Sequence, residues 1–274
     1  MLEFVKSKKL LFLLSVFFPH FTFASFEIYG NNVVNIALAG AGCAADEFRI
    51  CAAVNPAFAK CDNSFTLSYR RLFGLPELQH TSLSFNRPIN KFNCGSELYY
   101  FGFSQYSESA LSFSAAYPVT RRLYIGGRLS LYQLTISGYG SRLIIAGGTG
   151  MQYRVFDTLS MGLAADNISD WRIRRQNDKL PFKFTFGAAY QPDANLHIFA
   201  DFYQEDRFPS EIKCGLEYNL LRKIVLRMGV SPQTDIFACG MDLLFPQLKF
   251  CYAFRNHPYL GIEHTLGVSM RIPN

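Results

Sequence analysis

The residues best able to do chemistry in this 274-residue chain are His197 and Asp201, an imidazole and a carboxylate four positions apart. Held close to a hydroxyl or a thiol, such a pair could activate a nucleophile. The segment around them reads as extended, however, and side chains four residues apart on a strand lie about 13 Å from each other. No serine on the same face completes the set. We therefore expect no enzyme and no cofactor.

Glycine clusters and cysteines are the other candidates for a site. The runs Gly40-Ala41-Gly42 and Gly147-Gly148-Thr149-Gly150 lack the strand–turn–helix setting of a phosphate-binding loop, and glycine more often marks a bend in a strand. The cysteine spacings match no zinc pattern, so we predict no metal site, although one pair among the first three could form a disulfide. The seven cysteines are Cys43, Cys51, Cys61, Cys94, Cys214, Cys239 and Cys251.

Charged residues are the most regular polar feature of the chain, because they fall on the strand face opposite the apolar residues. An Arg or Lys facing lipid costs about 2–4 kcal/mol at the bilayer midplane, whereas one facing an aqueous interior costs little. We expect these charges to face an enclosed lumen, and their mixed signs predict ion pairs across a narrow or occluded interior. They are Arg128, Lys183, Asp201, Lys213, Glu217, Arg227, Asp242, Lys249 and Arg271.

The elements that position these charges are short strands with apolar residues at every second position, from residue 63 to the end. The segment 182–190 is the clearest, since Phe182, Phe184 and Phe186 alternate with Lys183 and Thr185. A sheet that crosses a bilayer must close on itself to satisfy its backbone groups. We predict an all-β fold, a transmembrane antiparallel barrel of about fourteen strands over residues 63–274. A soluble sandwich of two stacked sheets is the alternative.

The connections between the predicted strands alternate in length. PVTRR, RVFDT, QPDAN, NLLRK and FPQL are compact turns, whereas LFGLPELQ, SGYGSR, DNISDWRIRRQNDKLP and QEDRFPS are longer. Short periplasmic turns and longer outer loops are typical of outer-membrane barrels. The 27 Phe and 15 Tyr residues suit the aromatic girdles of such barrels. The net charge of +6 is too mild and dispersed to indicate nucleic-acid binding.

The N-terminus has the pattern of an export signal. Three lysines (Lys6, Lys8, Lys9) precede the apolar run at 10–18, and Thr22-Phe23-Ala24 supplies a cleavage site. We predict a signal peptide over residues 1–24, cleaved after Ala24, with a retained membrane anchor as the alternative. The outer membrane of a Gram-negative-type envelope is the expected location.

Residues 25–62 precede the first predicted strand and break the alternation. The stretch 33–61 is rich in Ala, Gly and Cys, which favours short helix and turn over strand. We predict a plug folded into the mouth of the barrel, with a simple N-terminal cap as the alternative.

Short pieces spread over residues 30–272 resemble the PorV/PorQ-type outer-membrane proteins, a branch of the FadL-like barrels. They include Ala39-Gly40-Ala41-Gly42 before Asp46, then Asn55-Pro56-Ala57, Gly74-Leu75-Pro76-Glu77-Leu78, Gly138-Tyr139-Gly140-Ser141 and Leu226-Arg227-Met228-Gly229-Val230. The resemblance implies a fourteen-stranded barrel with an N-terminal plug, to which Asp46, Asn55, Pro56 and Ala57 would belong. It also implies carriage of hydrophobic compounds, as in FadL-like proteins, or service to type IX secretion, as in PorV and PorQ.

Three functions therefore stay open at this point. The first is gated transport of small apolar solutes across the outer membrane. The second is a scaffold or shuttle component of a type IX secretion system, and the third is a soluble exported β-protein. The expected partners are outer-membrane lipids, apolar small-molecule cargo and secretion-system proteins, with no nucleic acid.

Overall fold

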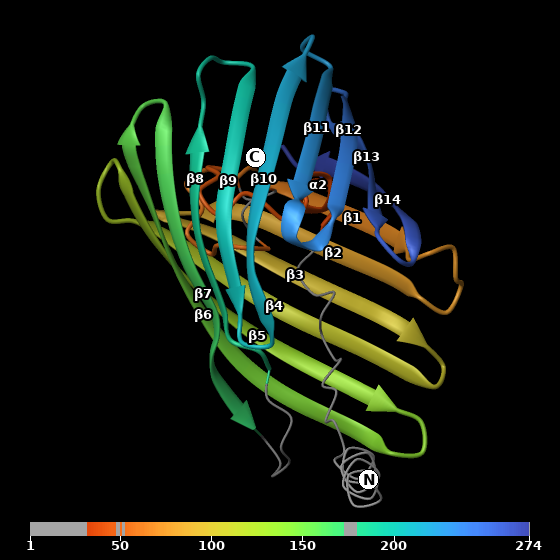
Figure 1. The fold of residues 1–274 in the computed structure, drawn as a ribbon. Coiled ribbons are helices and arrows are strands. Elements are labelled where there is room, and N and C mark those ends of the chain that lie inside the picture. Colours follow the sequence, from red (N-terminus) through yellow and green to blue (C-terminus); the bar gives the residue numbers. More distant parts are fainter. Residues whose placement is uncertain (1–31, 48–49, 51–52, 173–179, 274) are drawn as a thin grey trace, which may run out of the picture.

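The fold is a single sheet of fourteen antiparallel strands closed into a barrel (Figure 1). The computed structural model describes residues 32–47, 50, 53–172 and 180–273, without the side chains of 169–172. Every strand pairs with its neighbours in the chain, and β1 pairs with β14 over eight residue pairs, Ser64↔Arg271 to Arg71↔His264. The prediction of a closed fourteen-stranded barrel is confirmed. The predicted signal peptide lies outside the described residues.

The strands differ widely in length. Their bounds are β1 Ser64–Arg71, β2 Gln79–Ile89, β3 Phe92–Phe103, β4 Tyr106–Pro118, β5 Leu123–Ile136, β6 Gly140–Phe156, β7 Leu159–Arg172, β8 Lys183–Tyr190, β9 Leu196–Glu205, β10 Phe208–Leu220, β11 Ile224–Ser231, β12 Ile236–Leu244, β13 Leu248–His257 and β14 Gly261–Arg271. The described helical elements are α2, Val33–Ala37, and the 3₁₀ turn η1, Pro232–Thr234. No helix in the described part of the chain is long and apolar enough to cross a membrane.

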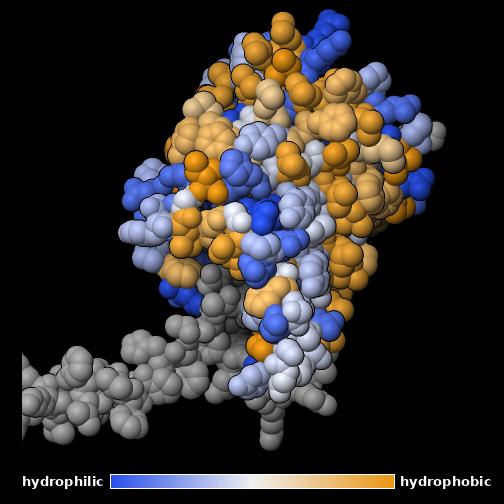
Figure 2. Space-filling model, turned by 90° about the vertical axis from the view of Figure 1, so that its right-hand side faces the viewer, coloured by the Kyte–Doolittle hydropathy of each residue, from blue (hydrophilic) through white to orange (hydrophobic). Residues whose placement is uncertain are grey.

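The two faces of the sheet differ in polarity as the alternation predicts. Large apolar side chains such as Leu129 (58% exposed) and Leu266 (59%) point outward, whereas Ser112, Ser130 and Thr265 are buried inside. Figure 2 shows apolar side chains gathered over the upper part of one face and down its right-hand edge. The exposure of Leu266 and the closed sheet contradict the two-sheet sandwich, which would bury that residue between layers.

The end of the barrel where β1 begins and β14 ends is here called the proximal end, and the opposite end the distal end. The expectation of long distal loops is wrong at several positions. Only Asp206 and Arg207 separate β9 from β10, and only Ser137–Tyr139 separate β5 from β6. Backbone pairing needs no apolar side chain, so these strands continue past the point where their alternation fades. The segment 173–179 lies outside the described residues.

The segment from 32 to 62, here called the inner segment, lies within the barrel where it is described (Figure 1). It begins with α2, capped by the Asn32 side chain, which accepts a hydrogen bond from the Asn35 backbone N–H at 2.9 Å. Residues of α2 and the following turn form an apolar core with Phe199 and Ala253 of the barrel wall. Short helix and turn over this segment agree with the prediction.

Glycines in the wall let the inner segment approach closely. At Gly126, Gly162 and Gly229 a Cβ atom would overlap the backbone of the inner segment, at Pro56, Cys43 and Leu38 respectively. Because glycine has no Cβ, the backbone of one layer rests directly on the other. Part of the specificity of this contact therefore lies in small residues of the wall.

The wall is irregular between β6 and β7. Gly147 of β6 pairs with Ser169 of β7, whereas Thr149 pairs with Ala165. The register therefore shifts between these two pairs, and β7 carries the extra residues. The extra β7 residues include Asn167, whose φ is +58°, and this left-handed conformation is one that asparagine tolerates better than most residues. Asp166 faces inward with Ser160, Gly162 and Ala164 of the same strand, at a place where Gly148 leaves room for its carboxylate.

Candidate functional site inside the barrel

A buried carboxylate holds the inner segment to the wall. Asp201 on β9 is 2% exposed, and its Oδ2 accepts hydrogen bonds from the backbone N–H groups of Gly42 at 2.8 Å and Cys43 at 2.9 Å. His197 takes no part, since its Nδ1 lies 3.7 Å from Oε1 of Glu217 instead. His197 and Asp201 thus have different partners, as expected for residues four positions apart on a strand. Asp201 acts as an anchor for the inner segment.

The predicted motif Asn55-Pro56-Ala57 makes a second attachment. The fully buried Asn55 donates through Nδ2 to the Cys43 carbonyl at 2.8 Å and to the Met151 carbonyl of β6 at 3.2 Å. Its Oδ1 accepts from the Ala57 backbone N–H at 2.9 Å, which fixes the turn. One side chain thus ties two parts of the inner segment to each other and to the wall.

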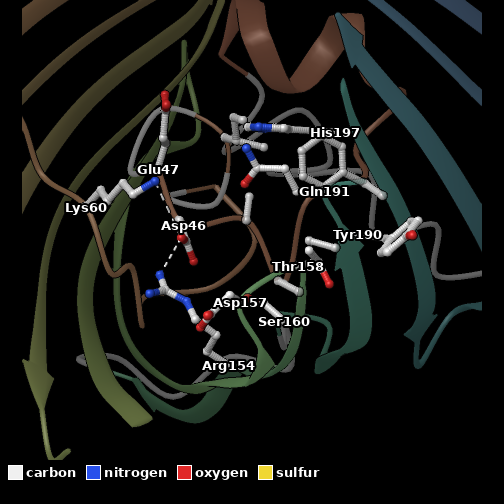
Figure 3. A pocket seen from close by; sticks show the side chains of 15 residues that line it. Asp46, Glu47, Lys60, Arg154, Asp157, Thr158, Ser160, Tyr190, Gln191 and His197 are labelled. Atoms are coloured by element: carbon white, nitrogen blue, oxygen red, sulfur yellow. Dashed lines mark hydrogen bonds and ion pairs between the residues drawn. The ribbon is translucent and has the colours of Figure 1, made fainter. Parts of the chain in front are cut away.

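Asp46, the acidic residue of the motif, makes a third attachment near the proximal end (Figure 3). Its carboxylate lies 2.6 Å from Nη2 of Arg154, 2.8 Å from Nε2 of Gln152 and 3.6 Å from Nζ of Lys60. The hollow beside these residues has a volume of only about 40 Å³. Its size allows little more than water, so the inner segment packs closely against the wall at this place.

The larger cavity lies in the distal half, between the inner segment and strands β7 to β13, with a volume of about 340 Å³. That volume falls in the range of small-molecule sites. One side is formed by small and apolar residues, among them Ala39, Gly40 and Val54 of the inner segment. The other side carries six charged residues, which are Asp166, Lys183, Glu205, Glu211, Lys213 and Arg255.

An apolar cluster covers the distal interior beside β3 to β6. Tyr99, Phe101 and Tyr132 are buried there with Ile144 and with Leu180, which precedes β8. An ordinary water-filled lumen is lined by polar residues, so aromatic side chains on the inside indicate an interior that is partly apolar. The distal interior thus has an aromatic side and a charged side.

Most of the nine predicted charges lie inside the barrel. Arg128, Asp201, Glu217, Arg227 and Asp242 are buried. Lys183, Lys213 and Lys249 are half-buried, and Arg271 is exposed at the proximal rim, where its Nη2 lies 2.8 Å from Oδ2 of Asp62.

The ion pairs that the structure shows for Arg227 and Arg128 run along the wall, whereas ion pairs across the lumen were expected. Arg227 pairs with Glu217 on β10 at 2.6 Å and with Asp242 on β12 at 2.8 Å, both on adjacent strands. Arg128 reaches Asp166 at 3.1 Å past the small Gly148. The inner segment separates opposite walls, so the charges find partners along the wall.

Sequence reasoning missed several charges of the distal cavity. Glu205 belongs to the stretch QEDRFPS, which was predicted as a loop, and Glu211 follows that stretch directly, but both lie in strands. Extending the alternation from Asp201 by four residues would have placed Glu205 inside. Asp166 continues the inward set of Ser160, Gly162 and Ala164 on β7, and it was missed because DNISDWRIRRQNDKLP, which begins at Asp166, was predicted as a loop.

The described residues contain neither a metal-binding group nor a disulfide. No three His, Cys, Asp or Glu side chains gather there in a way that could hold a metal ion. None of the six described cysteines forms a disulfide, and Cys51 lies outside the described residues.

Comparison with known proteins gives a clear result for structure only. No protein-family model and no curated protein matches the sequence. The Ralstonia pickettii toluene transporter TbuX is similar in structure, with a TM-score of 0.72, 14% identity, and coverage of 90% of this chain and 100% of that chain. The Pseudomonas putida toluene transporter TodX has a TM-score of 0.68 and 13% identity, with coverage of 89% of this chain and 98% of that chain. The monoaromatic hydrocarbon channel CymD has a TM-score of 0.67 and 13% identity, with coverage of 91% of this chain and 100% of that chain.

At these identities the likeness shows the fold, a barrel like those of hydrocarbon transporters. The resemblance to PorV and PorQ and the role in type IX secretion stay predictions.

Proposed function

We propose that this protein spans the outer membrane and passes small apolar solutes inward through a barrel gated by the inner segment. The observation that carries the proposal is an apolar exterior around an interior that holds a ligand-sized distal cavity and, beside Asp46, a proximal hollow of only about 40 Å³. The structural likeness to hydrocarbon transporters supports it.

The arrangement favours selective passage over an open pore. The buried aromatic cluster of Tyr99, Phe101 and Tyr132 makes one side of the distal interior apolar, which suits the entry of an apolar body from that end. The solute then reaches the cavity of about 340 Å³ above the inner segment. Further movement requires the inner segment to shift, and the anchor at Asp201 sets how readily it does so.

The test uses a fluorescent apolar probe, N-phenyl-1-naphthylamine, which intact outer membranes exclude. Cells that express the protein should admit the probe several-fold faster than cells with an empty vector. Thr185 lines the distal cavity and is buried, so Thr185→Trp should fill the cavity and slow uptake. The neighbouring Phe186 points outward, and Phe186→Trp is the matched control that should leave uptake unchanged.

Equal amounts of folded barrel must be present in each strain, which heat-dependent migration on a detergent gel reports. Uptake no faster than in the empty-vector strain would contradict the proposal, as would equal rates for Thr185→Trp and the unaltered protein.

A further inference from the structure

We propose that the inner surface of the wall binds a small inorganic anion of halide size, such as chloride, between Arg70, His80, Thr265 and Arg255. The site lies near the distal end on four neighbouring strands, β13, β14, β1 and β2. The inference does not depend on the transport function proposed above.

The register of these strands brings the polar side chains of the site together. Arg70 on β1 lies opposite His80 on β2 and opposite Thr265 on β14. Two residues away on β14, Glu263 lies opposite Arg255 on β13. Arg255 is half-buried and the other four residues are buried. One stretch of the inner surface therefore carries two arginines, an imidazole and a hydroxyl around a single carboxylate.

Most of the donors in this cluster are unused. Nε, Nη1 and Nη2 of Arg70 make no hydrogen bond with any residue that the structure describes, and the same holds for Nε2 of His80, Oγ1 of Thr265 and Nε of Arg255. The imidazole nitrogen and the hydroxyl can each donate, as the guanidinium nitrogens do. A buried donor without an acceptor is costly, so a group of them on adjacent strands indicates an acceptor that they share.

The charges of the cluster are unbalanced as well. Nη2 of Arg255 lies 2.9 Å from Oε2 of Glu263, and the same oxygen is 3.6 Å from Nη1 of Arg70, so one carboxylate serves two guanidinium groups. A proton on His80 would add a positive charge directly opposite Arg70, so we count the imidazole as neutral. Two positive charges and one negative charge leave a surplus of one positive charge, which a monovalent anion would neutralise.

The packing determines the size of the anion. Arg70 is fully buried, and the ring of His80 packs against the ring of Tyr99 with 4.7 Å between the ring centroids. Side chains packed this closely suit a single-atom ion and exclude an organic body. Arg255 also lines the distal cavity, together with Asn35 of α2, so an ion can reach the cluster from that cavity.

Bromide is a suitable probe, because it resembles chloride and can be located by anomalous X-ray scattering. Crystals of the full-length protein grown in sodium bromide should show an anomalous peak within hydrogen-bond reach of Arg70 and of His80 or Thr265. Peaks confined to exposed lysines and arginines would show an adventitious ion only and would overturn the proposal.

Thermal stability tests the same site in solution. Protein in a non-ionic detergent, heated before electrophoresis, should unfold at a midpoint several degrees higher in sodium chloride than in sodium gluconate of equal concentration, because an ion that binds only the folded barrel stabilises it. Arg70→Met keeps a long side chain without charge or donors and should abolish this difference. Arg271→Met removes an exposed arginine at the proximal rim and is the matched control, which should keep the difference.

A second variant keeps the test decisive if Arg70→Met does not fold. Thr265→Val replaces the hydroxyl by a methyl group of similar shape and should shrink the difference between chloride and gluconate. Equal midpoints in the two salts for the unaltered protein would overturn the proposal, as would an undiminished chloride effect in the variants of the site. Neither readout involves the passage of a solute, so failure of the anion site and failure of the transport function are distinguishable.

Discussion

The anchor at Asp201 can be removed without disturbing the rest of the barrel. In Asp201→Ala the backbone N–H groups of Gly42 and Cys43 lose the carboxylate that accepts both. A hydrogen bond to a charged group contributes about 1.5–3 kcal/mol, so two bonds give a loss of at least roughly 3 kcal/mol. Every 1.4 kcal/mol is about a factor of ten in an equilibrium constant, so the inner segment should open about 100-fold more often.

Hydrogen–deuterium exchange followed by mass spectrometry measures this opening directly. Peptides covering 32–47 should exchange about 100-fold faster in Asp201→Ala than in the unaltered protein. Asp201→Asn keeps a neutral acceptor oxygen, whose hydrogen bonds are worth about half as much, and should give about a tenfold increase. The control is Asp193→Ala, because Asp193 accepts backbone N–H groups of Asn195 and Leu196 in an exposed turn away from the inner segment.

Exchange in 32–47 that is the same in Asp201→Ala and Asp193→Ala would refute the assignment of Asp201 as the anchor. Faster exchange in both variants and throughout the sheet would mean that the substitutions loosen the whole barrel.

Four further perturbations follow from the same structure. Gly126→Ala should lower the free energy of unfolding by about 1–3 kcal/mol in urea titrations from vesicles, because its Cβ overlaps the inner segment, whereas the outward Gly127→Ala should change little. Leu129→Arg places a charge on the lipid-facing surface and should cost about 2–4 kcal/mol in the same titration. Arg227→Ala removes the arginine that two buried carboxylates share and should cost about 3–5 kcal/mol. Burial raises the pKa of Cys61 to about 11, so its thiol stays protonated at pH 8. The thiol should therefore react with a maleimide more slowly at pH 8 than in the unfolded chain, and the reaction rate should rise toward pH 11. Equal rates in the folded and unfolded chains at pH 8 would contradict this.

The architecture was predictable because one energetic rule acts on every strand. A barrel that faces lipid must put apolar residues on one side, and the alternation around Phe184, Leu226 and Leu266 records that requirement directly. Closure follows from the need to pair every strand edge in a membrane. Neither inference requires knowledge of which residue lies opposite which.

The site was less predictable because it depends on register and on irregular backbone. Alternation indicates that Glu217 and Arg227 face inward, but only the pairing of β10 with β11 shows that they lie directly opposite each other. The contact of Asp201 with the backbone of Gly42 joins residues 159 positions apart, and no local pattern reports it. The contact of Asp166 on β7 with Arg128 on β5 reaches across β6, and the spacing of apolar residues does not report it either.

The central claim, that the inner segment closes the barrel, can be tested most directly by measuring ionic conductance. Single-channel recording in a planar bilayer should show no steady ionic conductance for the full chain. After deletion of residues 33–61, a barrel that keeps its heat-dependent gel migration should show discrete open-channel steps. Conductance of equal size in both proteins would contradict closure by the inner segment and, with it, the gated passage proposed for this barrel.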